Sequence, residues 1–187
     1  MVSTMDARVL ITESCPRDCW YCCNKHEGTK ESLETCRNRK DLLKYERVTL
    51  TGGEPLLYPG YTLEIATYLK DQGAKVYLNT TIWPEWVGEQ LIQAFTGITY
   101  SLHAPFSPDD NDMLEQFMSD ANGHGNRHRL NIDPDIVDTL MIDTSVFHRI
   151  QIFEIQDSCP VPEDVLLLLD EKCRGCVVEA QKEVKGC

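Results

Sequence analysis

Six short apolar segments alternate with stretches of helical periodicity along this chain of 187 residues. The apolar segments span residues 8–12, 47–51, 74–79, 97–102, 129–132 and 149–155. Strands that are joined through helices pair in parallel, and the crossovers between them are right-handed. The alternation therefore predicts one α/β domain with a parallel sheet, either an open barrel or a doubly wound sheet. Both architectures place functional loops at the carboxyl ends of the strands.

Helical patterns fill the gaps between these segments. Apolar residues recur at helical spacing in 61–70 and 84–95, and Ser107-Pro108 and Asp133-Pro134 are typical of helix starts. The stretch 121–128 is polar and contains two glycines, so we expect a solvated loop there.

Composition narrows the class of protein. The formal charge of −12 and the isoelectric point near 4.8 argue against nucleic acid as a partner, because tracking phosphates requires clustered Lys and Arg. No apolar run approaches the roughly 18 residues of a membrane span, and the amino terminus lacks a signal-peptide pattern. We therefore expect a cytoplasmic protein with no membrane partner. Nine cysteines in a reducing compartment are more often metal ligands or reactive thiols than disulfides.

Three cysteines with the spacing CxxxCxxC follow the first apolar segment: Cys15, Cys19 and Cys22. A four-iron cluster normally takes four cysteine ligands, so a loop with three leaves one iron open to another ligand. A closed zinc site is the alternative, but zinc favours four ligands in two separated pairs. Cys23 offers a second trio with Cys15 and Cys19, and we prefer Cys22 because it preserves the spacing. The loop predicts an iron–sulfur cluster with one open iron.

A glycine-rich turn, Gly52-Gly53-Glu54-Pro55, directly follows the second apolar segment. Two glycines at the carboxyl end of a strand let the backbone approach a ligand closely. Glu54 could accept hydrogen bonds from an ammonium group. Taken alone, the pattern is also typical of an ordinary turn from a strand to a helix.

Together, the cysteine loop and the glycine-rich turn resemble the radical S-adenosylmethionine (SAM) enzymes, and the resemblance covers nearly the whole chain. It implies a six-unit partial (β/α) barrel with parallel strands. It also implies a 4Fe-4S cluster on Cys15, Cys19 and Cys22, Tyr21 near the adenine of SAM, and the glycine-rich turn at the methionyl amino group. In this family the reduced cluster cleaves SAM to a 5′-deoxyadenosyl radical, which abstracts a hydrogen atom from the substrate.

Polar residues near later strand ends are further candidates. This family often places contacts to the ribose or carboxylate of SAM at such positions, which here are occupied by Asn79 and Ser101. Capping of a turn is the alternative for both residues. His103 is a candidate catalytic residue that could act as a proton donor. A substrate contact and a solvated turn residue are the alternatives for His103.

The carboxyl-terminal segment carries four further cysteines: Cys159, Cys173, Cys176 and Cys187. We divide the chain into a core at 1–158 and a Cys-containing carboxyl-terminal helix and tail at 159–187. The CxxC pair and its flanking cysteines could bind zinc or a second iron–sulfur cluster, since some family members carry auxiliary clusters after the barrel. A redox pair or free thiols are the alternatives.

These motifs do not identify the substrate, since they serve the initiation step that the family shares. Because the chain is close to the bare barrel, we expect a protein or peptide to close its open side. Tyr21-Cys22-Cys23-Asn24 resembles the pattern of activating enzymes for glycyl-radical proteins, whereas Ser101-Leu102-His103 departs from it. A small-molecule enzyme of the 7-deazaguanine type is the alternative, although Cys23-Asn24 departs from its motif.

The family resemblance also implies an electron donor such as flavodoxin or ferredoxin. A hypothesis of another class is a non-catalytic module that binds an iron–sulfur cluster or zinc. Cleavage of SAM in the presence of a reductant distinguishes the enzyme from the module.

Overall fold

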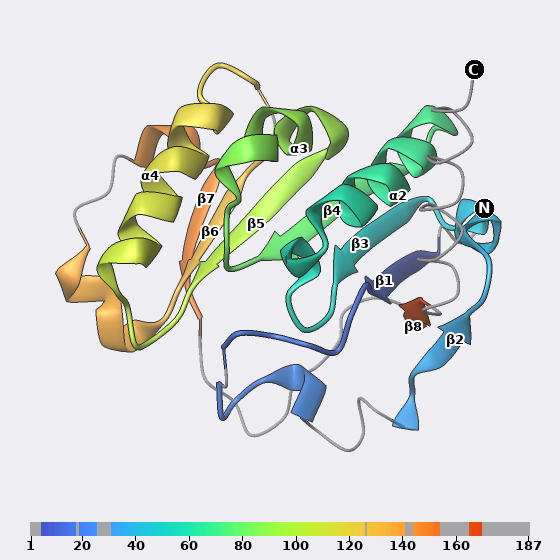
Figure 1. Cartoon of the computed structure of the whole chain (residues 1–187), viewed down its shortest axis with the longest axis horizontal. Coiled ribbons are helices and arrows are strands. Elements are labelled where there is room, and N and C mark those ends of the chain that lie inside the picture. Colours follow the sequence, from blue (N-terminus) through green and yellow to red (C-terminus); the bar gives the residue numbers. More distant parts are fainter. Residues whose placement is uncertain are drawn as a thin grey trace, which may run out of the picture.

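One all-parallel sheet organises the part of the chain that the structure describes (Figure 1). The structure is a computed structural model and describes residues 5–17, 19–25, 31–125, 127–140, 144–153 and 165–169. The strand order is β2-β8-β1-β3-β4-β5-β6-β7. The strands are β1 (Asp6–Leu10), β2 (Glu34–Cys36), β3 (Arg47–Thr51), β4 (Lys75–Thr80), β5 (Gly97–Leu102), β6 (Arg129–Ile132), β7 (Arg149–Ile152) and β8 (Val165–Leu169).

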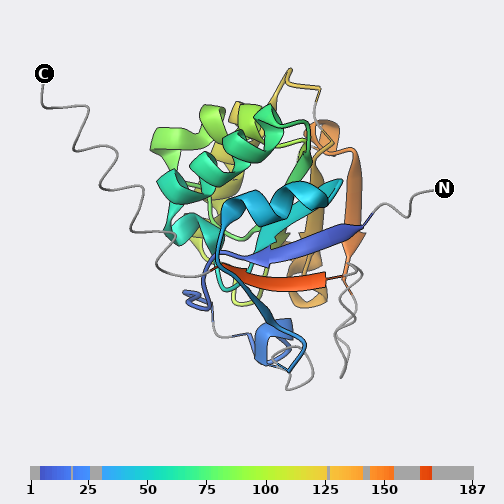
Figure 2. The ribbon, with the colours of Figure 1, turned by 90° about the vertical axis from the view of Figure 1, so that its right-hand side faces the viewer.

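Helices cover one face of this sheet. Among the described residues, the α-helices α2 (Pro59–Asp71), α3 (Gly88–Ala94) and α4 (Pro108–Ala121) lie on the same side of it (Figure 1 and Figure 2). Short 3₁₀ helices occupy several connections: η1 (Cys23–Lys25), η2 (Arg39–Lys44), η3 (Pro55–Leu57), η4 (Glu85–Val87), η5 (Pro134–Thr139) and η6 (Thr144–Val146).

The two faces of the sheet differ in polarity. Alternate residues of the central strands are apolar and fully buried in the core with the helices: Val9, Val48, Leu50, Val76, Leu78, Ile98 and Tyr100. The residues between them are half-buried and mostly polar, and the register pairs Thr49 with Tyr77, Asn79 with Thr99, and Ser101 with Asn131. Because paired residues project from the same face, these six side chains form one surface, which we call the polar face.

The α/β class and the parallel partial barrel are confirmed by this architecture. Three of the predicted strands coincide with β3, β5 and β6, and the other three overlap β1, β4 and β7 with shifted ends. Strands β1, β3, β4, β5, β6 and β7 pair in chain order. Such an order follows when each crossover returns to the neighbouring position with the same hand.

Two strands at the β1 edge were not predicted. β2 is only three residues long, too short to show a period. β8 lies within 159–187, for which we expected a helix and tail, and it pairs with both β1 and β2. Its sequence, Val165 followed by four leucines, is uniformly apolar and has no period that separates strand from helix. The rest of 159–187 lies outside the described residues, so the division of the chain at 158 stays a prediction.

Two local expectations are corrected. The segment that begins at Pro134 is the 3₁₀ helix η5, and only its Ile136 is buried. His128, which we expected in a solvated loop, is 1% exposed and packs edge-on against Phe117 of α4 at a ring distance of 5.5 Å. None of the helices among the described residues has the length and apolar character needed to cross a membrane.

Candidate functional site

The loop after β1 and the turn after β3 are locked together through their backbones. The N–H of Glu54 donates to the carbonyl oxygen of Ser14 at 2.7 Å. A Cβ atom on Gly53 would lie 1.9 Å from that same oxygen, so no other residue fits there without moving one of the loops. Gly52 has φ +92°, and a Cβ there would lie 2.5 Å from the Cβ of Leu10. Gly53 is therefore required by a close approach of backbone to backbone, and Gly52 by its positive φ and by the closeness of Leu10.

Cys15, Cys19 and Cys22 share the loop that this contact anchors, and all three side chains are half-buried. Burial raises the pKa of the Cys15 thiol, and the nearby Glu54, Cys22 and Cys19 raise it further. Burial also raises the pKa of Cys19, with a contribution from Cys22. The three thiols are thus close enough to interact electrostatically. However, no three His, Cys, Asp or Glu side chains among the described residues are arranged so that they could hold a metal ion.

The thiols nevertheless provide the donor chemistry that an iron–sulfur cluster requires. Three sulfur ligands come from one loop at the carboxyl end of β1, and the glycine-rich turn lies directly beside that loop. The side chain of Cys23 lies outside the described part of the structure, so the choice between Cys22 and Cys23 stays a prediction. The same holds for the tail cysteines, Cys159, Cys173, Cys176 and Cys187, which fall outside the described residues.

Glu54 is a buried carboxylate held by the protein itself. Its side chain is 1% exposed, and its Oε1 accepts hydrogen bonds from the N–H of Leu56 at 2.8 Å and the hydroxyl of Thr80 at 2.7 Å. Its Oε2 accepts one hydrogen bond, from the N–H of Thr81 at 2.8 Å. Burial raises the pKa of Glu54 to about 7, although these three donors lower it. Since a carboxylate oxygen can accept two hydrogen bonds, Oε2 retains an acceptor position.

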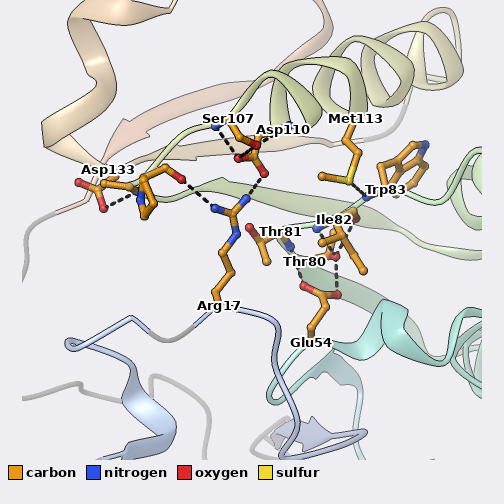
Figure 3. A network of polar contacts seen from close by, with 12 residues as sticks. Arg17, Glu54, Thr80, Thr81, Ile82, Trp83, Ser107, Asp110, Met113 and Asp133 are labelled. Atoms are coloured by element: carbon orange, nitrogen blue, oxygen red, sulfur yellow. Dashed lines mark hydrogen bonds and ion pairs between the residues drawn. The ribbon is translucent and has the colours of Figure 1, made fainter.

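Arg17 extends from the cysteine loop across the carboxyl ends of the strands (Figure 3). One guanidinium nitrogen, Nη1, donates to the carbonyl oxygen of Pro105 at 3.0 Å, just after β5. The other, Nη2, forms an ion pair with Oδ1 of Asp110 in the first turn of α4. The side chain of Arg17 is 17% exposed and that of Asp110 is 6% exposed. The pair is thus largely shielded from water.

Tyr21 reaches the same side of the site from the other end of the loop. Its hydroxyl donates to Oδ2 of Asp133 at 2.6 Å and lies 2.9 Å from Nδ1 of His103. Its ring stacks on His103 and tilts against Phe153. Burial lowers the pKa of His103 to about 4, and Arg17 adds to the shift, so the imidazole is neutral. Because the one hydroxyl proton of Tyr21 goes to Asp133, His103 must carry its proton on Nδ1 to complete the contact.

Residues 9–107 match the family model of the radical SAM superfamily, a match that covers more than half of the chain. The chain belongs to the radical SAM superfamily. Comparison with curated proteins gives no match. Members of this superfamily are enzymes that generally bind a 4Fe-4S cluster and SAM, so the chain is a radical SAM enzyme whose substrate is unknown.

The remaining predicted site residues of this radical SAM enzyme lie in three places. Asn79 and Ser101 lie within β4 and β5, on the polar face. Pro55 is the first residue of η3 and is buried. The structure brings Tyr21 and His103 into contact. The roles assigned to these residues toward SAM stay predictions.

Sequence reasoning missed several residues of the site: Arg17, Thr80, Thr81, Asp110 and Asp133. Arg17 is not part of a helical or strand-like sequence pattern, and nothing in the sequence shows which residues its long side chain contacts. Asp110 and Asp133 each belong to a helix-start pattern, which already explains a carboxylate at that position. The one available signal was the position of Thr80 and Thr81 at a strand end beside the strand that Glu54 follows.

Proposed function

We propose that Cys15, Cys19 and Cys22 hold a 4Fe-4S cluster that binds SAM at its open iron, and that the enzyme abstracts a hydrogen atom from a protein or peptide substrate. When bound, the reduced cluster supplies the electron that splits SAM into methionine and a 5′-deoxyadenosyl radical, which then takes the hydrogen atom. The residues of the chain bind these groups, orient them and keep water away.

The backbone lock between the two motifs carries this proposal. The hydrogen bond of 2.7 Å from Glu54 to Ser14 places the glycine-rich turn directly beside the loop with the three thiols. A ligand bound to an open iron on that loop would therefore meet the turn.

Charge and polarity support the expected contacts to SAM. Glu54 is shielded from water and has an acceptor position on Oε2, and burial strengthens its attraction for an ammonium group. Asn79 lies in β4 and Ser101 in β5, the two strands that follow β3 in the sheet. Both residues lie on the polar face and could form hydrogen bonds with polar groups of a ligand. Tyr21 offers an aromatic ring for the adenine.

An exposed aromatic residue supports a protein or peptide substrate. Trp20 lies in the cysteine loop, is 71% exposed and meets the ring of Tyr21 edge-on at 5.4 Å. Aromatic side chains are enriched in protein interfaces and supply large contact areas there. A macromolecular substrate that docks on Trp20 would cover the loop and exclude water from the radical. We further propose that the electron comes from a flavodoxin or ferredoxin.

Cleavage of SAM tests the proposed function. The full chain is purified without oxygen, reconstituted with iron and sulfide, and incubated with dithionite and SAM. We expect 5′-deoxyadenosine from the wild type and from Cys36→Ala, a change at a buried cysteine outside the loop, but none from Cys19→Ala. A cluster that forms but yields no 5′-deoxyadenosine with several reductants would contradict the proposal and favour a non-catalytic module.

The class of substrate needs a separate test. A deuterium-labelled cell extract is separated by ultrafiltration, and each fraction is added to the reconstituted enzyme. Deuterium in 5′-deoxyadenosine from the retained fraction, lost after protease treatment, supports a protein substrate. Deuterium transfer from a protease-resistant compound in the filtrate would show a small-molecule substrate instead.

A further inference from the structure

Two buried carboxylates grip the cysteine loop from the far half of the sheet. Asp110 is 4% exposed and binds the guanidinium of Arg17, which lies between Cys15 and Cys19. Asp133 is 1% exposed and accepts a hydrogen bond from the hydroxyl of Tyr21, which lies between Cys19 and Cys22. Each pair joins residues that are about half of the chain apart in sequence: 93 positions for the first and 112 for the second. The loop is thereby tied across the mouth of the barrel.

Both carboxylates divide their oxygens in the same way. In Asp110, Oδ2 accepts the N–H of Ser107 at 2.8 Å and its hydroxyl at 2.7 Å, while Oδ1 is left for Arg17 (Figure 3). In Asp133, Oδ1 accepts the N–H of Asp135 at 3.1 Å, while Oδ2 receives Tyr21 and the N–H of Ala104. One oxygen thus fixes the carboxylate to its own helix, and the other points to the loop.

This division makes each carboxylate a rigid partner for the loop. A side chain that is already fixed by backbone donors loses little conformational freedom when it binds a second group. Burial raises the pKa of Asp133, but Tyr21 and the N–H groups of Asp135 and Ala104 outweigh it and lower the pKa below its ordinary value. Asp133 is therefore a charged acceptor, for which hydrogen bonds are shorter and stronger than those between neutral groups.

We propose that Asp110 and Asp133 are positioning residues that hold the cysteine loop in place, through Arg17 and Tyr21, before a cluster binds. The proposal rests on the proposed function only in that the loop takes up a cluster. The backbone lock at Ser14 fixes the start of the loop, Asp110 its middle and Asp133 its end. The three thiols are then presented from a loop whose course does not depend on the metal.

The first test follows the thiols in the cluster-free full chain, reduced and kept without oxygen. Alkylation of each cysteine by iodoacetamide is followed by mass spectrometry, and Cys36, a buried thiol bonded to the carbonyl oxygen of Asn38 at 3.3 Å, reports general unfolding. We expect Tyr21→Phe, which removes one hydroxyl and no charge, to speed alkylation of Cys19 and Cys22 about tenfold with Cys36 unchanged.

The Arg17 pair gives a second, independent variant. We expect faster alkylation of Cys15 and Cys19 in Arg17→Gln, and restoration of most of the protection in Arg17→Lys, which keeps a cation for Asp110. Loss of a cation by itself would slow alkylation, because a nearby positive charge favours the reactive thiolate. Faster reaction therefore reports release of the loop rather than a change in thiol chemistry.

A double-mutant cycle assigns the effect to the carboxylates. Asp110→Asn and Asp133→Asn should each act like the change in its partner, and the combinations Arg17→Gln/Asp110→Asn and Tyr21→Phe/Asp133→Asn should add little to the single changes. Asp120→Asn is the control, since Asp120 also lies in α4 but bonds to Trp83 instead of the loop. On reconstituted protein, the same variants should lose cluster absorbance to a chelator faster than wild type.

Several outcomes would overturn the proposal. These are wild-type alkylation rates in both Tyr21→Phe and Arg17→Gln, fully additive effects in the cycles, or equal acceleration at Cys36. If even the wild type takes up no cluster, the proposed function fails while the alkylation rates still test the two anchors. If clusters form and SAM is cleaved but the rates do not change, the anchors fail alone.

Discussion

The two sides of the barrel mouth hold the cysteine loop by different means. On the β3 side, the contact is between backbones. The N–H of Glu54 donates to the carbonyl oxygen of Ser14, and a Cβ atom on Gly53 would lie only 1.9 Å from that oxygen. On the side of β5 and β6, side chains meet side chains, through the pairs of Arg17 with Asp110 and of Tyr21 with Asp133. The first contact tolerates no added atom, whereas the second depends on charge and on single hydrogen bonds.

This difference separates two tasks. A backbone contact fixes where the loop starts relative to the turn, and its geometry cannot be adjusted by substitution. Side-chain contacts can be weakened or strengthened in small steps, so they are suited to tuning how firmly the rest of the loop is held.

We expect the last cluster ligand of the loop to be Cys22, which directly follows Tyr21, the residue bonded to Asp133. Cys22→Ala should abolish cluster formation, while Cys23→Ala should retain it, as measured by iron and sulfide content after anaerobic reconstitution. Loss of the cluster only in Cys23→Ala would reverse the assignment and move the ligand away from Tyr21.

Gly53→Ala tests the backbone side directly. We expect a loss of about 3 kcal/mol or more in the free energy of unfolding, because the added methyl group overlaps a backbone carbonyl. Gly60→Ala is the matched control: Gly60 lies in the first turn of α2, a Cβ there meets nothing within 4 Å, and the change should be neutral or stabilising. Urea denaturation of both variants measures the difference. Equal stability of the two would show that the lock is loose.

His128 lies at the opposite end of β6 from Asp133. Because it makes the stability of the fold depend on pH, the two sides of the barrel mouth can be compared only at a pH where His128 is neutral. Burial, and then His124, lower its pKa to about 4, and neither ring nitrogen has a partner among the described residues. The unfolded chain, with a pKa near 6.5, therefore binds more protons than the folded protein at acidic pH. Stability is full above about pH 6.5 and falls toward pH 4.

For His128 alone we expect a loss of about 2 kcal/mol between pH 7 and pH 5. His128→Leu should remove this part of the acid sensitivity and be at least as stable at pH 7, because two unpaired nitrogens leave the core. The remaining sensitivity should include His103, whose pKa is lowered in the same direction. An unchanged pH profile of His128→Leu in urea denaturation would contradict the assignment.

Glu54 belongs to the backbone side, but its carboxylate reaches β4, so it tests whether that side also binds ligand. Glu54→Gln should weaken SAM binding about tenfold and leave the cluster absorbance intact, since a charge-assisted hydrogen bond is lost. Equilibrium dialysis with labelled SAM measures the affinity. Glu64→Gln, at a part-buried ion pair with Arg39 away from the cysteine loop, is the control. An unchanged affinity in Glu54→Gln would exclude the ammonium contact.

Much of the fold could be predicted because its strands are short, apolar and separated by clear helix starts. Segments 47–51, 97–102 and 129–132 coincide with β3, β5 and β6. β8 could not be assigned, since a run of leucines fits a strand and a buried helix equally well. The 3₁₀ geometry of η5 was not predicted, and its N-cap Asp133 bonds to Tyr21 as well as to its own helix.

The site was predicted only where spacing carries the chemistry. The cysteine loop and the glycine-rich turn are continuous motifs, and their meeting in space follows from adjacent strands. The contacts of Arg17 and Tyr21 join residues far apart in sequence, so no local sequence pattern could predict them. For Asp110 and Asp133, a role at the start of a helix was enough to explain the residue type. The sequence therefore gave no sign that the second carboxylate oxygen of each bonds to the cysteine loop.

The position of β8 affects the order in which the chain can fold. β1 pairs with β3 early in the sequence, but β8 is the strand that lies between β1 and β2 in the sheet. During synthesis, β2 therefore cannot pair with β8 until residue 169 has left the ribosome. Contacts of such high sequence separation slow folding and leave strand edges open meanwhile. A nascent or truncated chain that ends at 158 should expose the edge of β1, directly beneath the loop that carries the cysteines.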